Sequence, residues 1–102
     1  MTTLYEVTLK FDAAIAEEYD VWLEQHVEEM LALPGFVSAE ISTIEEGDLS
    51  ANEVGRVVHY RLEDRAAFDA YLRNHAAGMR DEGIQRFGDR ARASRRLLRP
   101  VR

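Results

Sequence analysis

The spacing of apolar residues constrains this chain more than any other feature, because it switches between two periods along the sequence. Three segments alternate apolar and polar residues, and a fourth near the end is also expected to be extended: Leu4–Phe11, Phe36–Ile44, Arg56–Leu62 and about Arg90–Leu98. Alternation with a period of two is typical of strands that bury one face. Between the strands, apolar residues recur every third or fourth position from Tyr19 to Leu31 and from Phe68 to Met79, which predicts two amphipathic helices.

Capping and helix-breaking residues give approximate ends for these helices. Asp12 and Asp64 precede the two helical stripes, and a short acidic side chain can accept hydrogen bonds from the free amides of a helix N-terminus. Pro34 and Gly35 follow the first stripe and predict its end, and Gly83 is expected to end the second.

The resulting order of elements is strand–helix–strand–strand–helix–strand, which is that of an α+β ferredoxin-like βαββαβ sandwich. We expect one domain spanning residues 1–102, with a four-stranded antiparallel sheet and both helices on one face. Val37, Ala39 and Ile41 are expected to face the helices. The opposite, open face is polar, and sheet faces of this kind often meet in pairs, so we predict a homodimer. The candidate contact residues on this face are Glu6, Glu40, His59 and Arg61.

The two halves of the chain carry opposite charge. Residues 1–53 hold 13 acidic side chains and one basic residue, Lys10, whereas residues 54–102 hold 12 arginines and 6 acidic side chains, so −12 and +6 sum to the net charge of −6. A nucleic-acid interface needs a clustered basic surface, so no nucleic-acid partner is expected. Seven arginines nevertheless fall between Arg86 and Arg102. Neutralisation of the acidic half is the favoured interpretation, and an anion or nucleic-acid site is the alternative.

The absence of cysteine excludes a disulfide framework, a thiol nucleophile and metal centres bound through cysteine. It is consistent with a reducing cytoplasm, which is the expected location. The longest nearly apolar run, Met30–Val37, contains proline and glycine and is too short to cross a membrane, and no secretory signal is visible. Dinucleotide, phosphate-loop and zinc-protease motifs are absent, so no cofactor and no metal are expected.

Three histidines are the side chains best suited to proton transfer near neutral pH. His26 and His75 lie on the two helical stripes, which cover the same face of the sheet, so we expect them to approach each other. They are either buried structural histidines or part of a cleft that binds a small molecule. The other candidate ligand-binding residues are Trp22, Tyr71, Arg80 and Arg86.

The segment Arg86–Asp89 is expected to turn the chain from the second helix into the last strand. Phe87 is the large apolar residue of this stretch and should anchor the turn in the core, and Gly88 can adopt a backbone angle that other residues resist. Arg86 and Asp89 are interpreted as serving this turn, with ligand binding as the alternative.

The segment His75–Asp89 resembles a family of small bacterial proteins known only as a domain of unknown function. The family has His-Ala-Pro, then Leu-Arg, Glu-Gly and Arg-Phe-Gly-Asp, and this chain has Ala77 and Met79 where the family has proline and leucine. Similar residues also occur in the first half, at Tyr5-Glu6-Val7, at Trp22-Leu23 with His26, and at Gly35-Phe36 with Ser38-Ala39. The resemblance implies a dimeric α/β barrel of ferredoxin-like subunits and implies no activity.

These observations favour a dimeric module that binds a small ligand or a partner, without an assignable reaction. The alternative is a cofactor-independent, monooxygenase-like enzyme acting on a small aromatic or anionic substrate, since such enzymes occur in the wider fold group. A ligand-sized space around His26, Tyr71 and His75 would distinguish a site from a sealed core.

Overall fold

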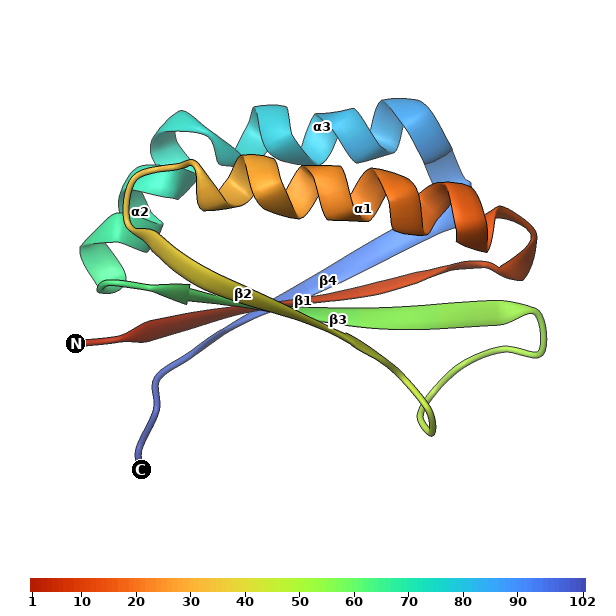
Figure 1. Cartoon of the computed structure of the whole chain (residues 1–102), viewed down its shortest axis with the longest axis horizontal. Coiled ribbons are helices and arrows are strands. Elements are labelled where there is room, and N and C mark those ends of the chain that lie inside the picture. Colours follow the sequence, from red (N-terminus) through yellow and green to blue (C-terminus); the bar gives the residue numbers. More distant parts are fainter.

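Three α-helices cover one face of a four-stranded antiparallel sheet and leave its other face open (Figure 1). The computed structural model describes residues 1–102, and its elements follow in the order β1 (Thr3–Asp12), α1 (Ala16–Leu31), β2 (Phe36–Thr43), β3 (Glu53–Leu62), α2 (Arg65–Asn74), α3 (Ala76–Phe87) and β4 (Ala91–Leu98). Short 3₁₀ helices precede α1 and β4, namely η1 (Ala13–Ile15) and η2 (Gly88–Arg90). The strands lie in the order β2-β3-β1-β4, so the predicted ferredoxin-like βαββαβ fold is confirmed.

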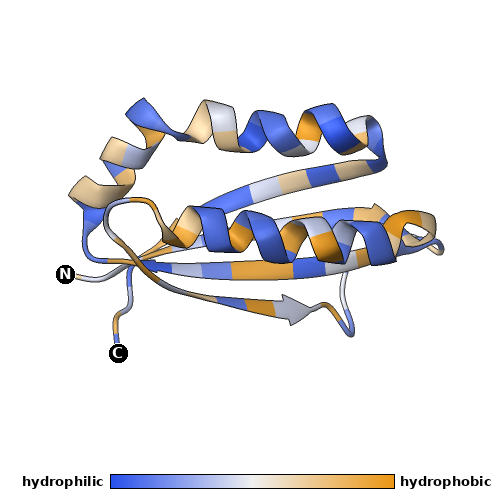
Figure 2. Cartoon of the chain, turned by 45° about the horizontal axis from the view of Figure 1, so that its top comes forward, coloured by the Kyte–Doolittle hydropathy of each residue, from blue (hydrophilic) through white to orange (hydrophobic).

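The alternation of β1 places every second side chain against the helices. These side chains are all buried: Tyr5, Val7, Leu9 and Phe11. The buried residues of α1 that pack toward the sheet are Tyr19, Leu23, Val27 and Met30. With residues of β3, α2 and α3 they form a core of 17 buried hydrophobic residues. Hydrophobic and hydrophilic residues accordingly alternate along the strands and along α1 (Figure 2).

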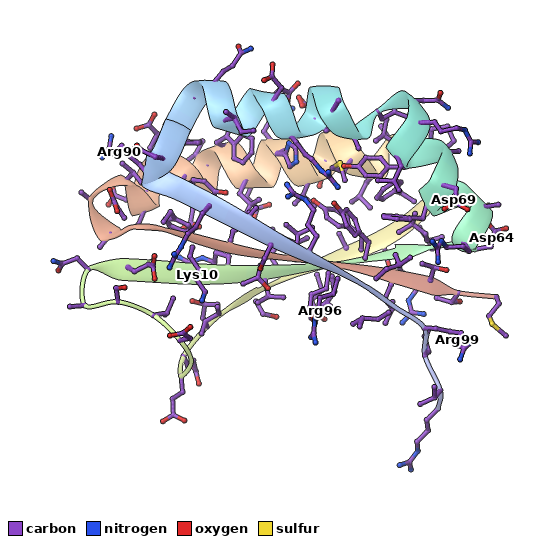
Figure 3. The ribbon with its side chains drawn as sticks, turned by 180° about the vertical axis from the view of Figure 1, so that it is seen from behind. Lys10, Asp64, Asp69, Arg90, Arg96 and Arg99 are labelled. Atoms are coloured by element: carbon purple, nitrogen blue, oxygen red, sulfur yellow. The ribbon has the colours of Figure 1, made fainter.

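A row of charged residues crosses the open face of the sheet. Glu6 of β1 lies opposite His59 of β3 and Arg96 of β4, and Glu40 of β2 lies opposite His59. Arg96 Nε donates a hydrogen bond to Glu6 Oε1 at 2.7 Å, and His59 Nε2 lies 2.8 Å from Glu6 Oε2. The hydrogen bond from Arg96 is the main reason that the pKa of Glu6 is lowered, so this carboxyl group stays charged. Arg96 points away from the helices (Figure 3), and Arg61 lies on the same face of β3.

Two local expectations are wrong, one at each end of the segment that contains α1. Asp12 precedes the 3₁₀ helix η1, but its side chain makes no capping hydrogen bond, and its carboxylate instead lies 3.7 Å from Arg90 Nε. In β2 the register shifts between Phe36 and Ser38, so Phe36 is buried and Val37 is 56% exposed rather than facing the helices. A β-bulge adds one residue to a strand and moves the following side chains to the other face, which simple alternation does not predict.

The second helical stretch is divided into two helices at His75 and ends later than expected. His75 leaves the helical backbone with φ −133° and separates α2 from α3. Gly83 does not end the helix, because α3 continues to Phe87. At Gly83 the helix approaches α1 closely, and a Cβ atom there would lie 3.0 Å from the ring of Trp22. The end comes at Gly88, which has φ +57°, while Phe87 is buried as predicted.

Other predicted helix ends are confirmed. Asp64 Oδ1 accepts a hydrogen bond from the amide of Ala67 at 2.8 Å and so caps α2. Pro34 and Gly35 follow α1, and Gly35 has φ +83°. None of the helices is both long enough and apolar enough to cross a bilayer.

Replacing Gly35 with alanine should destabilise the protein by about 1–3 kcal/mol, because its backbone angle is unfavourable for other residues and the new Cβ would clash with Ala67 Cβ. Gly78→Ala is the matched control. Gly78 lies in α3 with open space around it, so this change should stabilise the protein by about 0.5–1 kcal/mol. Urea unfolding followed by circular dichroism measures both changes, and a Gly35→Ala variant as stable as the parent would contradict the close approach of Gly35 to α2.

Candidate functional site

A cavity of about 270 Å³ lies between the helices and the sheet. Twenty residues line it, and 14 of them are hydrophobic. Its floor consists of buried side chains from β1, β3 and α1, including Tyr5, Tyr60, Leu23 and Met30. Small-molecule sites commonly combine an apolar lining of this kind with a few polar groups, so this cavity is the candidate site.

The cavity opens between α3 and β4. Its exposed lining residues all belong to these two elements or to the turn that joins them: Ile84, Gly88, Arg92, Ala93 and Arg95. On the helix-facing side of β4, Ala91 lies opposite Phe11 and Ala93 lies opposite Leu9. These two alanines leave space that longer side chains would fill. A ligand would therefore enter beside β4, at the edge of the sheet, with the buried floor at the far end.

Arg80 of α3 brings a guanidinium group into the cavity. Its Nη2 donates a hydrogen bond to the hydroxyl oxygen of Tyr5 at 3.2 Å, although Tyr5 is only 2% exposed. Its Nε atom is buried and has no hydrogen-bond partner. No carboxylate lies within 4.0 Å of this side chain. Arg80 therefore presents an unused donor inside a mostly apolar space.

Arg95 of β4 supplies a second guanidinium group at the opening. It lies opposite Val7, whose side chain faces the helices, so Arg95 projects from the same side of the sheet. Its neighbours Ser94 and Arg96 lie opposite Thr8 and Glu6 and belong to the open face. Like Arg80, Arg95 has no carboxylate within ion-pair distance.

His26 of α1 is a third polar group in the lining. Its ring stacks on Trp22, with ring centroids 4.6 Å apart and an interplanar angle of 20°. Its Nδ1 atom is buried and lies 3.8 Å from Glu82 Oε2, which is too long for a hydrogen bond. Burial therefore outweighs the attraction to Glu82 and lowers the pKa of His26, so the imidazole is neutral at neutral pH.

Tyrosines surround these three groups. Burial raises the pKa of Tyr19 to about 12, and it also raises the pKa values of Tyr60 and Tyr71. Their hydroxyl groups therefore stay protonated at neutral pH and can donate hydrogen bonds. Tyr5 is stacked on Tyr60, with ring centroids 5.9 Å apart. The cavity thus combines aromatic walls with neutral donors and two cations.

The structure brings together four of the six residues that the sequence singled out as ligand-binding candidates. Trp22, His26, Tyr71 and Arg80 line the cavity. The other two lie elsewhere. His75 sits at the junction of α2 and α3, partly exposed and without a side-chain hydrogen bond, and it does not converge with His26. Arg86 is exposed on α3, where its Nη2 lies 3.5 Å from Glu18 Oε1 of α1.

Sequence reasoning missed Arg95 as a cavity residue. In β4 the run Arg95-Arg96 has no apolar–polar alternation, so the sequence left open whether Ser94 or Arg95 belongs to the open face. The pairing of β4 with β1 settles this, because it places Arg95 on the side of Val7. Tyr5 and Tyr60 were expected on the core faces of their strands, but the sequence gave no sign that a cavity lies beside them. No group of three His, Asp or Glu side chains is arranged to hold a metal ion.

Comparison by sequence places residues 2–101 within DUF4286, a domain of unknown function. This confirms the expected resemblance to a domain-of-unknown-function family. No curated protein matches the chain significantly.

Several solved structures share the fold. A variant of SnoaB, a cofactor-independent oxygenase from Streptomyces nogalater, is 15% identical, with 98% of this chain and 94% of that chain covered and a TM-score of 0.68. An EthD family protein from Bacillus halodurans is 9% identical, with 97% and 99% covered and a TM-score of 0.71. HapK from Hahella chejuensis is 22% identical, with 99% and 93% covered and a TM-score of 0.62. At these identities the likeness concerns the fold alone.

Proposed function

We propose that this chain, which belongs to the DUF4286 family of unknown function, binds a small ring compound in the cavity between its sheet and its helices. The observation that carries the proposal is a pair of buried polar atoms without hydrogen-bond partners, His26 Nδ1 and Arg80 Nε, on two residues that line the same apolar cavity. Buried polar atoms in folded proteins nearly always have a partner. Two that lack one beside the same space favour a ligand that supplies it.

The volume of the cavity limits the ligand to one or two rings. An apolar cavity of about 150 Å³ accommodates benzene, and this cavity measures about 270 Å³. Tyr19 and Trp22, whose ring centroids are 5.5 Å apart, offer aromatic surfaces against which a flat ring can pack. A substituted single ring or two fused rings therefore match the space.

Proton transfer in the same cavity is a second candidate function. The neutral imidazole of His26 can accept a proton at Nδ1 from an acidic group on a bound molecule. The fold is also similar to that of SnoaB, a cofactor-independent oxygenase, which supports chemistry carried out by side chains alone. Binding remains the main proposal, because it rests on the cavity and needs no assumption about the reaction.

We further propose that two copies of the chain associate through the open faces of their sheets. Glu6, His59 and Arg96 already pair within one subunit, so their charges are compensated before the face is covered. Leu4 and Leu98 lie opposite each other on this face and are only partly buried, and a second copy would remove them from water. A contact that uses the same face twice joins the copies around a two-fold axis.

The location and the domain organisation are part of the same proposal. We place the protein in the cytoplasm, because a chain without cysteine needs no oxidising compartment. We treat residues 1–102 as one domain, since a single core cluster joins the sheet to all three α-helices.

Isothermal titration calorimetry with naphthylmethanol, a neutral compound of two fused rings, should give saturable binding of one molecule per chain. Ala93→Phe should abolish this binding, because Ala93 lies at the opening on the helix-facing side of β4. Ala77→Phe is the control, since Ala77 is exposed on α3 and lies outside the cavity lining. An unchanged affinity in Ala93→Phe, or an equal loss in both variants, would contradict binding in this cavity.

Proton transfer should appear as exchange of the acidic carbon-bound hydrogens of the ketone β-tetralone for deuterium in D₂O, followed by NMR. Only the neutral imidazole of His26 accepts a proton, so the rate should fall as the pH falls through the pKa of His26. Because that pKa is lowered, the fall should come below the ordinary histidine value of about 6.5. His26→Gln should lose the exchange, and His59→Gln, which changes a histidine of the open face, should keep it. Exchange that survives in His26→Gln would rule out this role.

Sedimentation equilibrium at micromolar concentration should give a mass near twice 11.7 kDa. Arg61→Glu should shift the protein toward the monomer, because it places a new acidic group on the face that carries Glu6 and Glu40. Arg73→Glu makes the same charge change on α2 and should leave the dimer intact. A parent protein that sediments near 11.7 kDa would refute the dimer.

A further inference from the structure

We propose that the ligand of the cavity is a ring compound with a single anionic oxygen group, a carboxylate or an enolate, held by Arg80 and Arg95. This inference rests on the proposed binding function and adds the chemical class of the ligand. The rings would fill the aromatic floor, and the anionic group would lie between Arg80, which is bonded to the buried Tyr5, and Arg95 at the opening between α3 and β4.

The pairing of the other basic residues supports this assignment. The chain has 19 acidic and 13 basic side chains, so carboxylates are in excess. Seven basic residues lie within 4.0 Å of a carboxylate: Lys10, Arg56, Arg65, Arg86, Arg90, Arg92 and Arg96. Arg61, Arg73, Arg99 and Arg102 lack such a partner but are exposed to water. Arg80 and Arg95 are the two unpaired cations that line the cavity.

Arg80 keeps donors for a ligand, because a guanidinium group carries five N–H groups and only one of them is bonded to Tyr5. Nη2 is engaged with the Tyr5 hydroxyl group, which fixes the plane of the guanidinium group from the buried side. Nε is buried without a partner, and an unsatisfied buried donor is costly to the folded state. A hydrogen bond from a guanidinium group to an anionic oxygen is shorter and stronger than one to a neutral oxygen. An anion beside Nε would therefore satisfy Arg80 better than a hydroxyl group.

The charge of Arg95 acts throughout the same space. Burial sets the direction of the pKa shifts of four side chains that line the cavity, and the positive charge of Arg95 acts on all four: Tyr19, His26, Tyr60 and Tyr71. In each case it opposes positive charge or favours negative charge. Glu82 and Glu29 act on His26 with the opposite sign, but Glu82 is half exposed on α3 and Glu29 is exposed on α1. The charge of Arg95 therefore acts in favour of an anion and against a cation in this space.

The apolar floor narrows the ligand class further. Inorganic phosphate or a sugar phosphate would leave the 14 hydrophobic lining residues without a matching surface. A hydrocarbon would leave Arg80 Nε without an acceptor. A fused-ring carboxylate satisfies both parts of the site, because its rings can pack on the floor while its carboxylate reaches the two arginines.

Calorimetric titration with naphthoate and with naphthylmethanol separates this inference from the proposed function, because the two probes share their rings and differ in charge. The parent protein should bind naphthoate at least about tenfold more tightly than the alcohol, which corresponds to about 1.4 kcal/mol. Arg80→Met and Arg95→Met should each remove most of this preference and leave the affinity for the alcohol nearly unchanged. Arg73→Met, which removes an exposed arginine of α2, should behave like the parent.

Each outcome decides one of the two claims. Equal affinity of the parent for the two probes would overturn the anionic ligand and leave binding in the cavity intact. Binding of neither probe would overturn the proposed function itself. Because Arg80 is bonded to the core and its variant can lose stability, Arg95→Met provides the independent test. Arg95 is exposed and makes no ion pair, so this variant should melt like the parent. A preference for naphthoate that survives in folded Arg95→Met would exclude Arg95 from the site.

Discussion

The pairing of β1 with a strand on each side is the constraint on which the rest of the structure depends. β3 and β4 fix its register from both edges, so the odd-numbered side chains face the helices and the even-numbered ones face the open side. Tyr5 therefore packs in the core and accepts a hydrogen bond from Arg80. The adjacent Glu6 pairs with His59 and Arg96 on the opposite face. A slip of one residue would exchange the two faces and remove the cavity and the charged row together.

The cavity lies where the helices pack closely together but β4 carries small side chains. Gly83 lets α3 come close to Trp22 of α1, which closes the helix layer on that side. On β4, by contrast, Ala91 and Ala93 are too small to fill the space in front of Leu9 and Phe11. The floor is packed as a core, whereas the opening has mostly small or charged residues, with Ile84 as the large apolar exception. The same edge of the molecule therefore supplies both the entry and the cations.

The sequence was sufficient for the fold, because that depends on periods that many residues share. It also placed Trp22, His26 and Tyr71 on stripes that face the sheet, and it singled out Arg80 as a ligand-binding candidate. The features that could not be predicted from the sequence depend on single positions. The bulge at Val37 and the helix break at His75 arise from packing between distant segments. The direction of Arg95 depends on the register of an arginine-rich strand without alternation, and a cavity depends on what neighbouring side chains leave unfilled.

The edge position of β4 separates the residues that stabilise the protein from the residues that determine its ligand preference. Stability comes mainly from the buried floor on β1, β3 and α1, whereas the rim of the cavity, residues 84–95, is largely exposed. Apart from changes at the buried Phe87, substitutions along that rim alter the size and charge of the entrance while sparing the packed interior. Related chains can therefore diverge in ligand preference through neutral drift of one strand and one turn, and a protein engineer can vary the same short segment as a library on a constant scaffold.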